Sequence, residues 1–318
     1  MTADAVDGPY DGLGPRPTGL GGILRSAAGS IPPAGLVLLS IFSVQLGGGF
    51  AKDLFSSLPP SAVVFLRIAF GALILTIFAR PRLKGLTRRD LAAAAGFGLT
   101  LAMMNLSFYE ALARLPMGIA VSIEFLGPLT IAVAASRRRL DLLWVGLAAV
   151  GVALMAPWGE SGSASWIGIG FALLAGVFWA GYILMSAAVG SRFSGASGLS
   201  LAMLVAMVVI APVGIGTGGG DLLQPELLLI GLAVGLLSSV IPYTLELNAL
   251  RRMPKHVFGI LMSLEPAAAA LVGLVVLGEI LGVQQWAAII CIVGASLGAT
   301  RTSSPAVSGP AASEPAGS

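Results

Sequence analysis

The sequence predicts an all-α polytopic membrane protein with ten transmembrane helices, arranged as two inverted five-helix repeats. Three observations lead to this fold class: an apolar composition, ten long apolar stretches and an internal repeat of five stretches. Of the 318 residues, 56% are hydrophobic and only 10% are charged, and the mean hydropathy is +0.94. An ordinary soluble domain is about 25% charged. Because so few charges cannot cover a water-facing surface, most of the surface is expected to face lipid.

Ten stretches are apolar enough to cross a bilayer, which requires about 20 mostly apolar residues per helix. The fifth is the shortest. No long polar segment separates any two of them, so we expect no soluble domain. The predicted spans are 34–52, 61–79, 91–109, 117–135, 142–157, 166–186, 196–215, 227–247, 257–277 and 283–300.

The two ends of the chain have a different composition. Residues 1–33 are rich in Gly, Pro and Asp and lack the layout of a cleaved signal peptide, and residues 301–318 are rich in Ser, Pro and Ala. Such segments bury too little apolar surface to fold. We therefore predict two disordered cytoplasmic tails, with a first repeat at 34–158 and a second repeat at 166–300 between them.

The positive charges indicate how the helices are oriented. With both termini in the cytoplasm, the loops on that side hold fifteen of the 18 Lys and Arg residues. Cytoplasmic loops carry such an excess, so the sequence predicts a multi-pass protein of the inner membrane with both termini inside. Since the basic residues form short clusters in loops, they give no indication of a nucleic-acid partner. The fifteen are Arg16, Arg25, Arg80, Arg82, Lys84, Arg88, Arg89, Arg137, Arg138, Arg139, Arg192, Arg251, Arg252, Lys255 and Arg301.

A weak internal repeat relates the two halves. Because a unit of five helices crosses the membrane an odd number of times, the second copy must be inverted. Inverted repeats are a recurring design of secondary transporters, whose substrate sites lie near the membrane midplane. Chance similarity between two Ala/Leu-rich segments is the alternative explanation. The matched pairs, each 138 positions apart, are Ala111–Ala249, Leu112–Leu250, Arg114–Arg252, Pro116–Pro254, Pro128–Pro266 and Asp141–Glu279.

Five ionisable residues lie within or at the end of predicted spans: Lys52, Arg67, Glu124, Glu246 and Glu265. A charged group in hydrocarbon is costly and usually faces a cavity or a partner. Glu124 and Glu265 are the most informative, because a carboxylate has no long stem with which to reach the membrane surface. The basic residues have plainer interpretations: Lys52 could extend to the outer surface, and Arg67 could be a structural partner of a carboxylate.

Polar and aromatic side chains form stripes on four spans, which implies a shared polar interior. Pro128, Pro242 and Pro266 agree with this, because a proline cannot donate to the carbonyl four residues earlier. A freed carbonyl at membrane depth needs a neighbour or a cavity. Trp179 and Tyr182 could also be packing residues. The stripes, at helical spacings, are Gln45 with Lys52, Asn105 with Tyr109, Trp179 with Tyr182, and Tyr243 with Glu246.

No metal or cofactor is expected. The chain has one Cys, Cys291, and one His, His256, so no Cys-based metal site can form within one chain. A membrane-embedded enzyme would need a nucleophile–base pair or metal ligands at depth. The sequence holds no such pattern, and we predict that the protein is not an enzyme. It also holds no Walker-type phosphate-binding motif, so an ion gradient or the substrate's own gradient would drive transport.

Three long segments carry a family resemblance: LLSIFSVQLGGGFAKDLF (38–55), MNLSFYEALARLPMGIAVSIEFLGPL (104–129) and FGILMSLEPAAAALVGLVVLGE (258–279). They resemble the EamA-type drug/metabolite transporter superfamily, and within it the threonine/homoserine exporter branch, over about 34–300. The resemblance implies ten helices with cytoplasmic termini. It also implies efflux of small amino acids, with protons as the coupling ion.

The resemblance and the polar stripes together give a candidate substrate site. A zwitterionic amino acid needs an anion site, which Lys52 or Arg67 could supply, and a cation site, which Glu124 or Glu265 could supply. The same two acids are the candidates for proton coupling, because apolar surroundings disfavour the charged form of a carboxyl group. The candidate substrate-binding residues are Gln45, Lys52, Arg67, Asn105, Tyr109, Glu124, Trp179, Tyr182, Tyr243, Glu246 and Ser263.

A second hypothesis remains open at this point. An exporter of the same superfamily could carry another metabolite, such as a purine, a sugar derivative or a drug, and an aromatic-lined cavity without paired charges would favour it. The fold alone does not decide the substrate, and the sequence does not predict the oligomeric state.

Overall fold

The computed structural model describes residues 31–81, 86–134, 140–155, 165–190, 192–193 and 197–302. Within these ranges every regular element is helical, and each of the ten predicted spans contains helix. The predicted all-α fold is therefore confirmed. The predicted tails lie almost wholly outside the described residues, and so do seven of the fifteen basic residues assigned to the cytoplasm. Those seven are Arg16, Arg25, Arg82, Lys84, Arg137, Arg138 and Arg139.

Seven of the spans are single helices. Short 3-10 turns follow two of them: η1 (Leu54–Ser56) after the first and η2 (Gly219–Leu223) after the seventh. The seven helices are α2 (Pro33–Asp53), α3 (Pro60–Ala79), α4 (Arg88–Leu112), α7 (Leu140–Met155), α8 (Trp166–Gly190), α9 (Ser197–Gly218) and α14 (Val283–Thr302).

Three spans are interrupted, a feature that the hydropathy of the sequence does not predict. The fourth consists of α5 (Met117–Glu124) and α6 (Leu126–Ala134). The eighth consists of α10 (Pro225–Gly235), a π-helical segment η3 (Leu236–Val240) and α11 (Ile241–Leu250). The ninth consists of α12 (Lys255–Met262) and α13 (Glu265–Leu277).

Helix ends follow local sequence signals. Prolines begin α2, α3 and α10. The first N–H groups of a helix have no acceptor within the helix, so a proline there costs no hydrogen bond. At the start of α4, Thr87 and Asp90 form a reciprocal capping box. α13 ends at Gly278, whose φ of 67° lies in the left-handed region that favours glycine.

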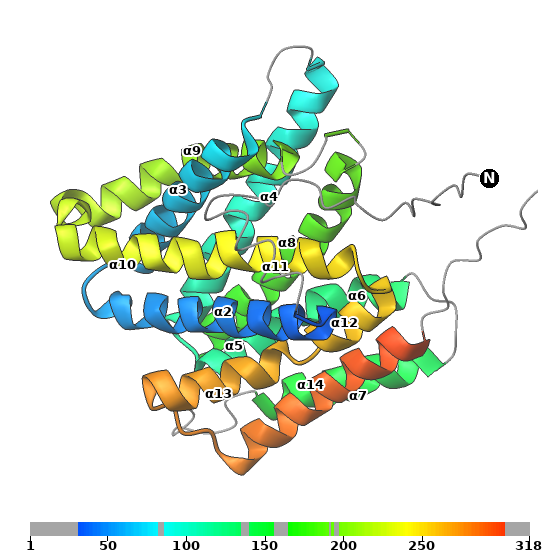
Figure 1. Ribbon diagram of the computed structural model, residues 1–318. Helices are drawn as coiled ribbons and strands as arrows, with labels where there is room; N and C mark the ends of the chain where they lie inside the picture. Colours follow the sequence, from blue (N-terminus) through cyan, green and yellow to red (C-terminus); the bar gives the residue numbers. More distant parts are fainter. Residues whose placement is uncertain are drawn as a thin grey trace, which may run out of the picture.

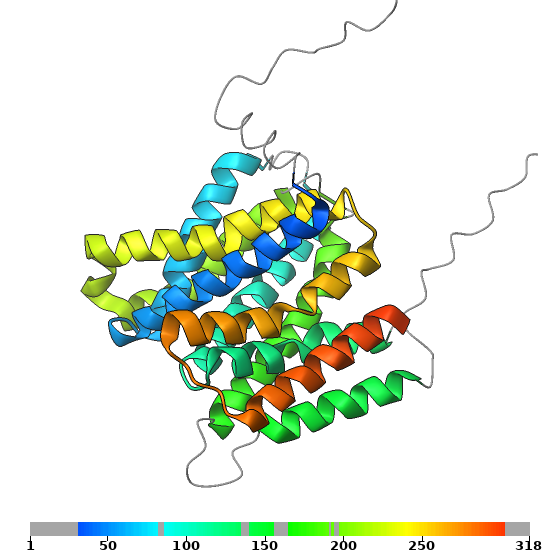
Figure 2. The same ribbon diagram turned by 60° about the horizontal axis from the view of Figure 1, so that its bottom comes forward.

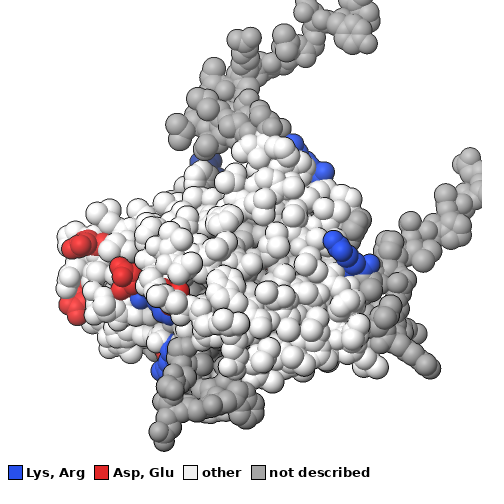
Figure 3. Space-filling view, turned by 90° about the horizontal axis from the view of Figure 1, so that it is seen from below, with Lys and Arg blue, Asp and Glu red and all other residues white. Residues whose placement is uncertain are grey.

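The outer surface is that of a multi-pass membrane protein. In the described part of the chain, eight helical segments are long and apolar enough to cross a membrane, and two further apolar helices, Met117–Ile131 and Leu142–Leu154, are shorter. Large apolar side chains are exposed on the flanks, Phe78 and Val275 by 78% and 80%. Figure 3 shows an uncharged band between one end that carries most of the acidic side chains in view and another end with only basic ones. A band of this kind matches the lipid-facing surface that the composition predicts.

The helices pack with approximate twofold symmetry (Figures 1 and 2). α3 packs along α9, and α7 packs along α14, so each helix meets its counterpart in the predicted repeat. α2 packs against α11, and their counterparts in the other half, α8 and α4, pack against each other. Two related halves would produce this pairing. The boundaries of the repeats, 34–158 and 166–300, stay a prediction.

Three consecutive glycines bring α2 close to three neighbours. A Cβ at Gly47 would lie 2.1 Å from Oγ of Ser238 in η3, and one at Gly48 would lie 2.9 Å from Cε of Met117 at the start of α5. A Cβ at Gly49 would lie 3.3 Å from a side chain of α13. α2 is therefore in direct contact with elements of both halves.

Candidate functional site

A cavity of about 1420 Å³ lies between the two halves. Its wall extends to Leu250 at the end of α11, Phe258 near the start of α12 and Arg301 near the end of α14, and Leu250 and Arg301 are exposed. In the opposite direction the wall reaches only Gly48 on α2 and Val121 on α5. The cavity therefore has a mouth at the end of the bundle where α11, α12 and α14 meet, and a blind end on the other side.

Nine of the twelve residues predicted for the site line this cavity. They come from seven helices that lie far apart in the sequence, so the shared polar interior that the stripes predict is present. Their role in binding substrate stays a prediction. The nine are Gln45, Arg67, Asn105, Glu124, Trp179, Tyr182, Tyr243, Glu246 and Glu265.

Lys52 is one of the three predicted residues that are not in the cavity wall. Its Nζ lies 2.5 Å from the carboxylate of Glu279 and donates a hydrogen bond of 2.5 Å to the carbonyl of Leu115. The ammonium group is therefore tied to the connections between helices, instead of lying in the cavity or extending alone to the surface.

Tyr109 and Ser263 lie behind the cavity wall. Tyr109 is fully buried, and its hydroxyl accepts a hydrogen bond from Nη1 of Arg67. Ser263 is also fully buried and shares a 2.8 Å hydrogen bond with Ser296, which does line the cavity. Both side chains support wall residues.

Arg67 is the cationic side chain in the inner part of the cavity wall. Its Nη2 donates to the carbonyl of Ser238 at 3.1 Å, its Nη1 donates to Tyr109 at 3.3 Å, and its Cζ lies 5.5 Å from the centre of the Tyr109 ring. Among the described residues, no carboxylate lies within 4.0 Å of the guanidinium. Arg67 is held by neutral groups, so the alternative of a structural ion pair does not describe it.

The carbonyl that accepts from Arg67 is one that the sequence predicts to be free. Pro242 cannot donate to Ser238, and the preceding π-helical segment leaves a second carbonyl, that of Leu237, which accepts from Oγ of Ser43 at 2.7 Å. Polar side chains of α2 and α3 thus satisfy the irregular backbone of η3, as membrane depth requires.

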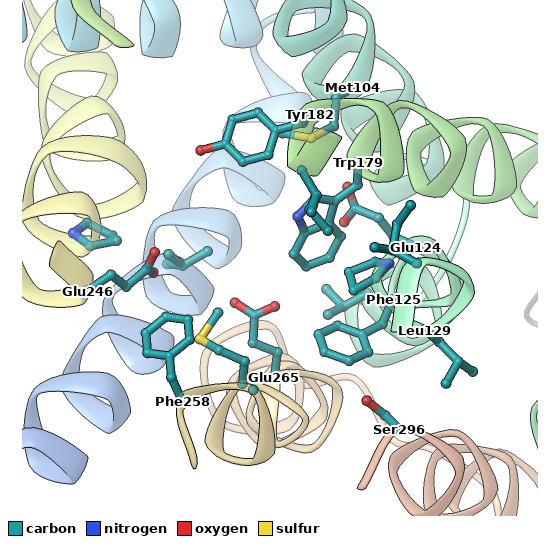
Figure 4. A pocket seen from close by; sticks show the side chains of 18 of the residues that line it. Met104, Glu124, Phe125, Leu129, Trp179, Tyr182, Glu246, Phe258, Glu265 and Ser296 are labelled. Atoms are coloured by element: carbon teal, nitrogen blue, oxygen red, sulfur yellow. The ribbon is translucent and has the colours of Figure 1, made fainter. Parts of the chain in front are cut away.

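Three carboxylates line the same cavity. Glu124 and Glu265 are 8% and 5% exposed, and Glu246 accepts a hydrogen bond of 2.6 Å from Ser40. In Figure 4 the carboxylate of Glu265 points into the space between Glu246 on one side and Trp179 and Glu124 on the other. No described cation lies within 4.0 Å of these three carboxylates. A buried carboxylate without an ion pair has to hold a proton or bind a cation, and the cavity offers space for both.

Two of these carboxylates lie at helix breaks. Glu124 is the last residue of α5, and Glu265 is the first residue of α13. Pro128 cannot donate to the carbonyl of Glu124, and Gly176 packs against that oxygen so closely that a Cβ there would lie 2.9 Å away. Pro266 lies in the first turn of α13, where proline fits.

Aromatic rings complete the wall. Trp179 packs edge-on against Phe125 with ring centres 5.5 Å apart, and Tyr182 packs against Phe97 at 5.1 Å. Tyr182 and Tyr243 both line the cavity and pack against one apolar cluster. Trp179 and Tyr182 are therefore packing residues and wall residues at once. In the part of the chain that the structure describes, no group of three His, Cys, Asp or Glu residues could hold a metal ion.

Sequence reasoning missed several residues of the site. Ser40 is fully buried and contacts Glu246. Ser40 and Ser43 lie three residues apart on a face of the first span other than that of Gln45 and Lys52, and this second polar pair was the signal that could have found Ser40. Phe258 and Ser296 line the cavity without any such signal, because single aromatic and serine residues are common in apolar helices.

Comparison with known proteins relates this architecture to a family. Residues 166–301 match the EamA-like transporter family. The threonine/homoserine exporter RhtA of Salmonella typhimurium is 39% identical over 271 residues, which cover 85% of this chain and 92% of the relative. The protein of the same name from Escherichia coli K12 is 38% identical with the same coverage. A solved structure that is 17% identical has a TM-score of 0.58 and covers 84% of this chain and 97% of its own, which supports the fold alone.

Proposed function

The chain belongs to the EamA-like transporter family, in the branch of the RhtA threonine/homoserine exporters, and we propose that it is a secondary exporter of small amino acids such as threonine and homoserine. The relatives of that name support the substrate class. The observation that carries the proposal is a cavity between the two halves that holds charged groups of both signs, which form no ion pair among the described residues. Export requires no covalent step, so we assign no catalytic residue.

A zwitterionic substrate fits this distribution of charge. Arg67 is fixed by Ser238 and Tyr109, so its orientation is set before a ligand arrives, and a guanidinium binds a carboxylate well. On the other walls, Glu124, Glu265 or both would receive the ammonium group. The aromatic rings between these ends would contact a short side chain.

Proton exchange is the coupling that we propose. When the substrate leaves, a carboxylate that held its ammonium group needs another positive partner, and a proton is the smallest available. Glu124 and Glu265 are the candidates, because both are nearly fully buried in the cavity wall. Exchange of substrate for proton at such a residue would link efflux to the proton gradient.

We also propose that the cavity mouth faces the cytoplasm of the cell and that both termini lie there, in the inner membrane. The exposed basic residues Arg251 and Arg301 lie near the mouth, and the exposed acids Asp221 and Glu226 lie at the opposite end of the bundle. This charge distribution follows the positive-inside rule. In a Cys291→Ala background, Asp221→Cys should react with an impermeant thiol reagent added to intact cells, and Arg251→Cys should not. The reverse pattern would overturn the orientation.

Counterflow in proteoliposomes tests the substrate. Vesicles loaded with unlabelled threonine should accumulate labelled threonine and homoserine, and vesicles made with an Arg67→Gln variant should not. Cells that overproduce the protein should tolerate more external threonine and hold less inside. Counterflow of nucleobases in place of amino acids would replace the proposal by its alternative.

One observation favours that alternative, an exporter of a purine, a sugar derivative or a drug. Ligand pockets usually measure about 300–1,000 Å³, and the cavity, at about 1420 Å³, is larger. Its wall includes the rings of Phe108, Phe125, Trp179 and Phe258. A panel that includes nucleobases and aromatic amines therefore belongs in the same counterflow experiment.

A further inference from the structure

A polar cluster joins separate segments of the chain at the end of the bundle opposite the cavity mouth. We call Lys52, Glu279 and the backbone of Leu115 and Met117 the outer cluster. Lys52 donates to one carboxylate oxygen of Glu279 and to the Leu115 carbonyl, each at 2.5 Å. The other oxygen of Glu279 accepts from the backbone N–H of Met117 at 2.7 Å.

Every contact in the outer cluster joins separate segments. Lys52 lies in the last turn of α2, Met117 is the first residue of α5, and Glu279 lies in the connection between α13 and α14. The residue before α5, Pro116, provides no side-chain cap, so Glu279 supplies an acceptor for that helix start. The cluster therefore ties two helices of the first half to a connection of the second half.

The outer cluster lies just beyond the blind end of the cavity. On α2, Gly48 lines the cavity and Lys52 follows one turn later; on α5, Met117 precedes Val121 by one turn, and Val121 lines it. α14 begins close to Glu279 and ends at the mouth, and a helix of 20 residues is about 30 Å long. In Figure 1 the end of α2 and the connection after α13 lie at the left, and the end of α14 lies at the right.

We propose that the outer cluster is an outer gate, which has to open before substrate can leave on the outer side. The structure then represents the loading state, with the mouth open and the gate closed. Lys52 serves this gate instead of contacting substrate. The inference rests on the proposed function as an exporter, but not on which substrate is carried.

A neighbouring ion pair provides a matched control. Arg114 and Glu110 lie at the same end of the bundle, also 2.5 Å apart, but they are four residues apart in the chain. Breaking this pair frees no helix from another. Any effect on gating that comes only from lost surface charge should appear equally in Glu110→Gln.

Accessibility from outside tests the gate without any substrate. A single cysteine is placed at Gln45, on the cavity wall, in a Cys291→Ala background, and intact cells are treated with an impermeant maleimide. Glu279→Gln removes the charge but keeps an acceptor for Met117, and Lys52→Met removes the other partner. If the outward-open form is a minor state, each variant should raise the labelling rate by about tenfold, and Glu110→Gln should leave it unchanged. Unchanged labelling in both gate variants, or rapid labelling of the parent protein, would overturn the proposal.

Closing the gate covalently is the complementary test. A Lys52→Cys/Glu279→Cys variant of the same background is treated with a cleavable bifunctional thiol reagent in proteoliposomes. Cross-linking should abolish threonine counterflow, and reductive cleavage should restore it; full transport with the cross-link in place would contradict the gate. If labelling behaves as expected but no amino acid shows counterflow, the result supports the gate and contradicts the proposed substrate.

Discussion

The two interrupted helices that carry Glu124 and Glu265 are counterparts in the repeat, yet they place their carboxylates differently. Between α5 and α6 only Phe125 is non-helical, and Glu124 ends the first half-helix. Between α12 and α13 two residues intervene, and Glu265 begins the second half-helix. At the repeat offset, Glu265 corresponds to Gly127 and not to Glu124. The symmetry of the fold therefore does not extend to the charged groups of the cavity.

This difference places the two carboxylates at opposite kinds of helix end. The start of a helix offers free N–H donors, and the end of a helix offers free carbonyl acceptors. Glu265 can remain an acceptor throughout a cycle, which suits recognition of an ammonium group. Glu124 lies among acceptors, which suits a group that alternates between donating its own proton and binding a cation. The two residues should therefore fail in different ways when they are changed.

Glu124→Gln should have the largest effect. The variant keeps the shape and hydrogen bonding of the side chain but cannot exchange a proton for a cation. We expect normal insertion, loss of proton-driven net efflux and retention of some substrate-for-substrate exchange, measured in proteoliposomes with and without a pH gradient. If Glu124 instead only balances the charge of Arg67 across the cavity, without an ion pair, the variant should express poorly and Arg67→Gln should partly rescue it. Normal expression with undiminished net efflux would contradict both the coupling role and the structural role of Glu124.

Glu265→Gln should come next and should affect both modes of transport equally. Losing a hydrogen bond to a charged group costs about 1.5–3 kcal/mol, so the KM for threonine should rise by about tenfold or more in net efflux and in exchange. The comparison of KM between the two modes is the measurement. An effect on net efflux alone would mean that Glu265 carries the proton.

Gly127→Ala tests why the first half carries no acid at the position of Glu265. A Cβ at Gly127 would lie 2.1 Å from the carbonyl oxygen of Gly176, so even the smallest side chain forces α6 away from α8. Overpacking of this kind costs about 1–3 kcal/mol and should lower the Tm in detergent. Gly146→Ala, where no atom lies within 4 Å of the added Cβ, is the control and should not lower the Tm, because alanine favours the helix more than glycine does.

Ser40→Ala should have the smallest effect, because it acts on Glu246, which lies within α11 and not at a helix break. Ser40 holds Glu246 on α11 through one hydrogen bond, and such a bond contributes about 0.5–1.5 kcal/mol. The KM for threonine should change by about threefold to tenfold, with Ser40→Thr restoring the parent value where the extra methyl group is tolerated. If Ser40→Ala raises the KM as much as Glu265→Gln does, Glu246 would have to be counted as a third carboxylate that binds the substrate.

Hydropathy predicts the position of every span, because length and apolar composition are local properties. The polar stripes predict most of the cavity wall for a similar reason: residues at helical spacing share a face, and in a membrane the polar face turns inward. Pro242 even predicts that the carbonyl of Ser238 needs a partner, which Arg67 supplies.

Other features depend on contacts that periodicity does not encode. Beside the break at Phe125, Gly127 and Gly176 approach closely although they lie on helices distant in sequence. The pairing of Lys52 with Glu279 joins residues from different halves. A single lysine at the end of a span looks the same in a sequence whether it binds substrate, reaches the surface or pairs with a distant acid.

The three glycines of α2 bear on the mechanics of the molecule. Each glycine lowers helix propensity by about 1 kcal/mol relative to alanine, and Gly47, Gly48 and Gly49 are consecutive, one turn before Lys52. The helical conformation of α2 is therefore least favoured at the level of the cavity's blind end. A bend there would carry Lys52 away from Glu279 while the rest of α2 stays packed on α11. The elasticity of this single helix, more than sliding between whole halves, would then set the rate at which the cavity changes sides.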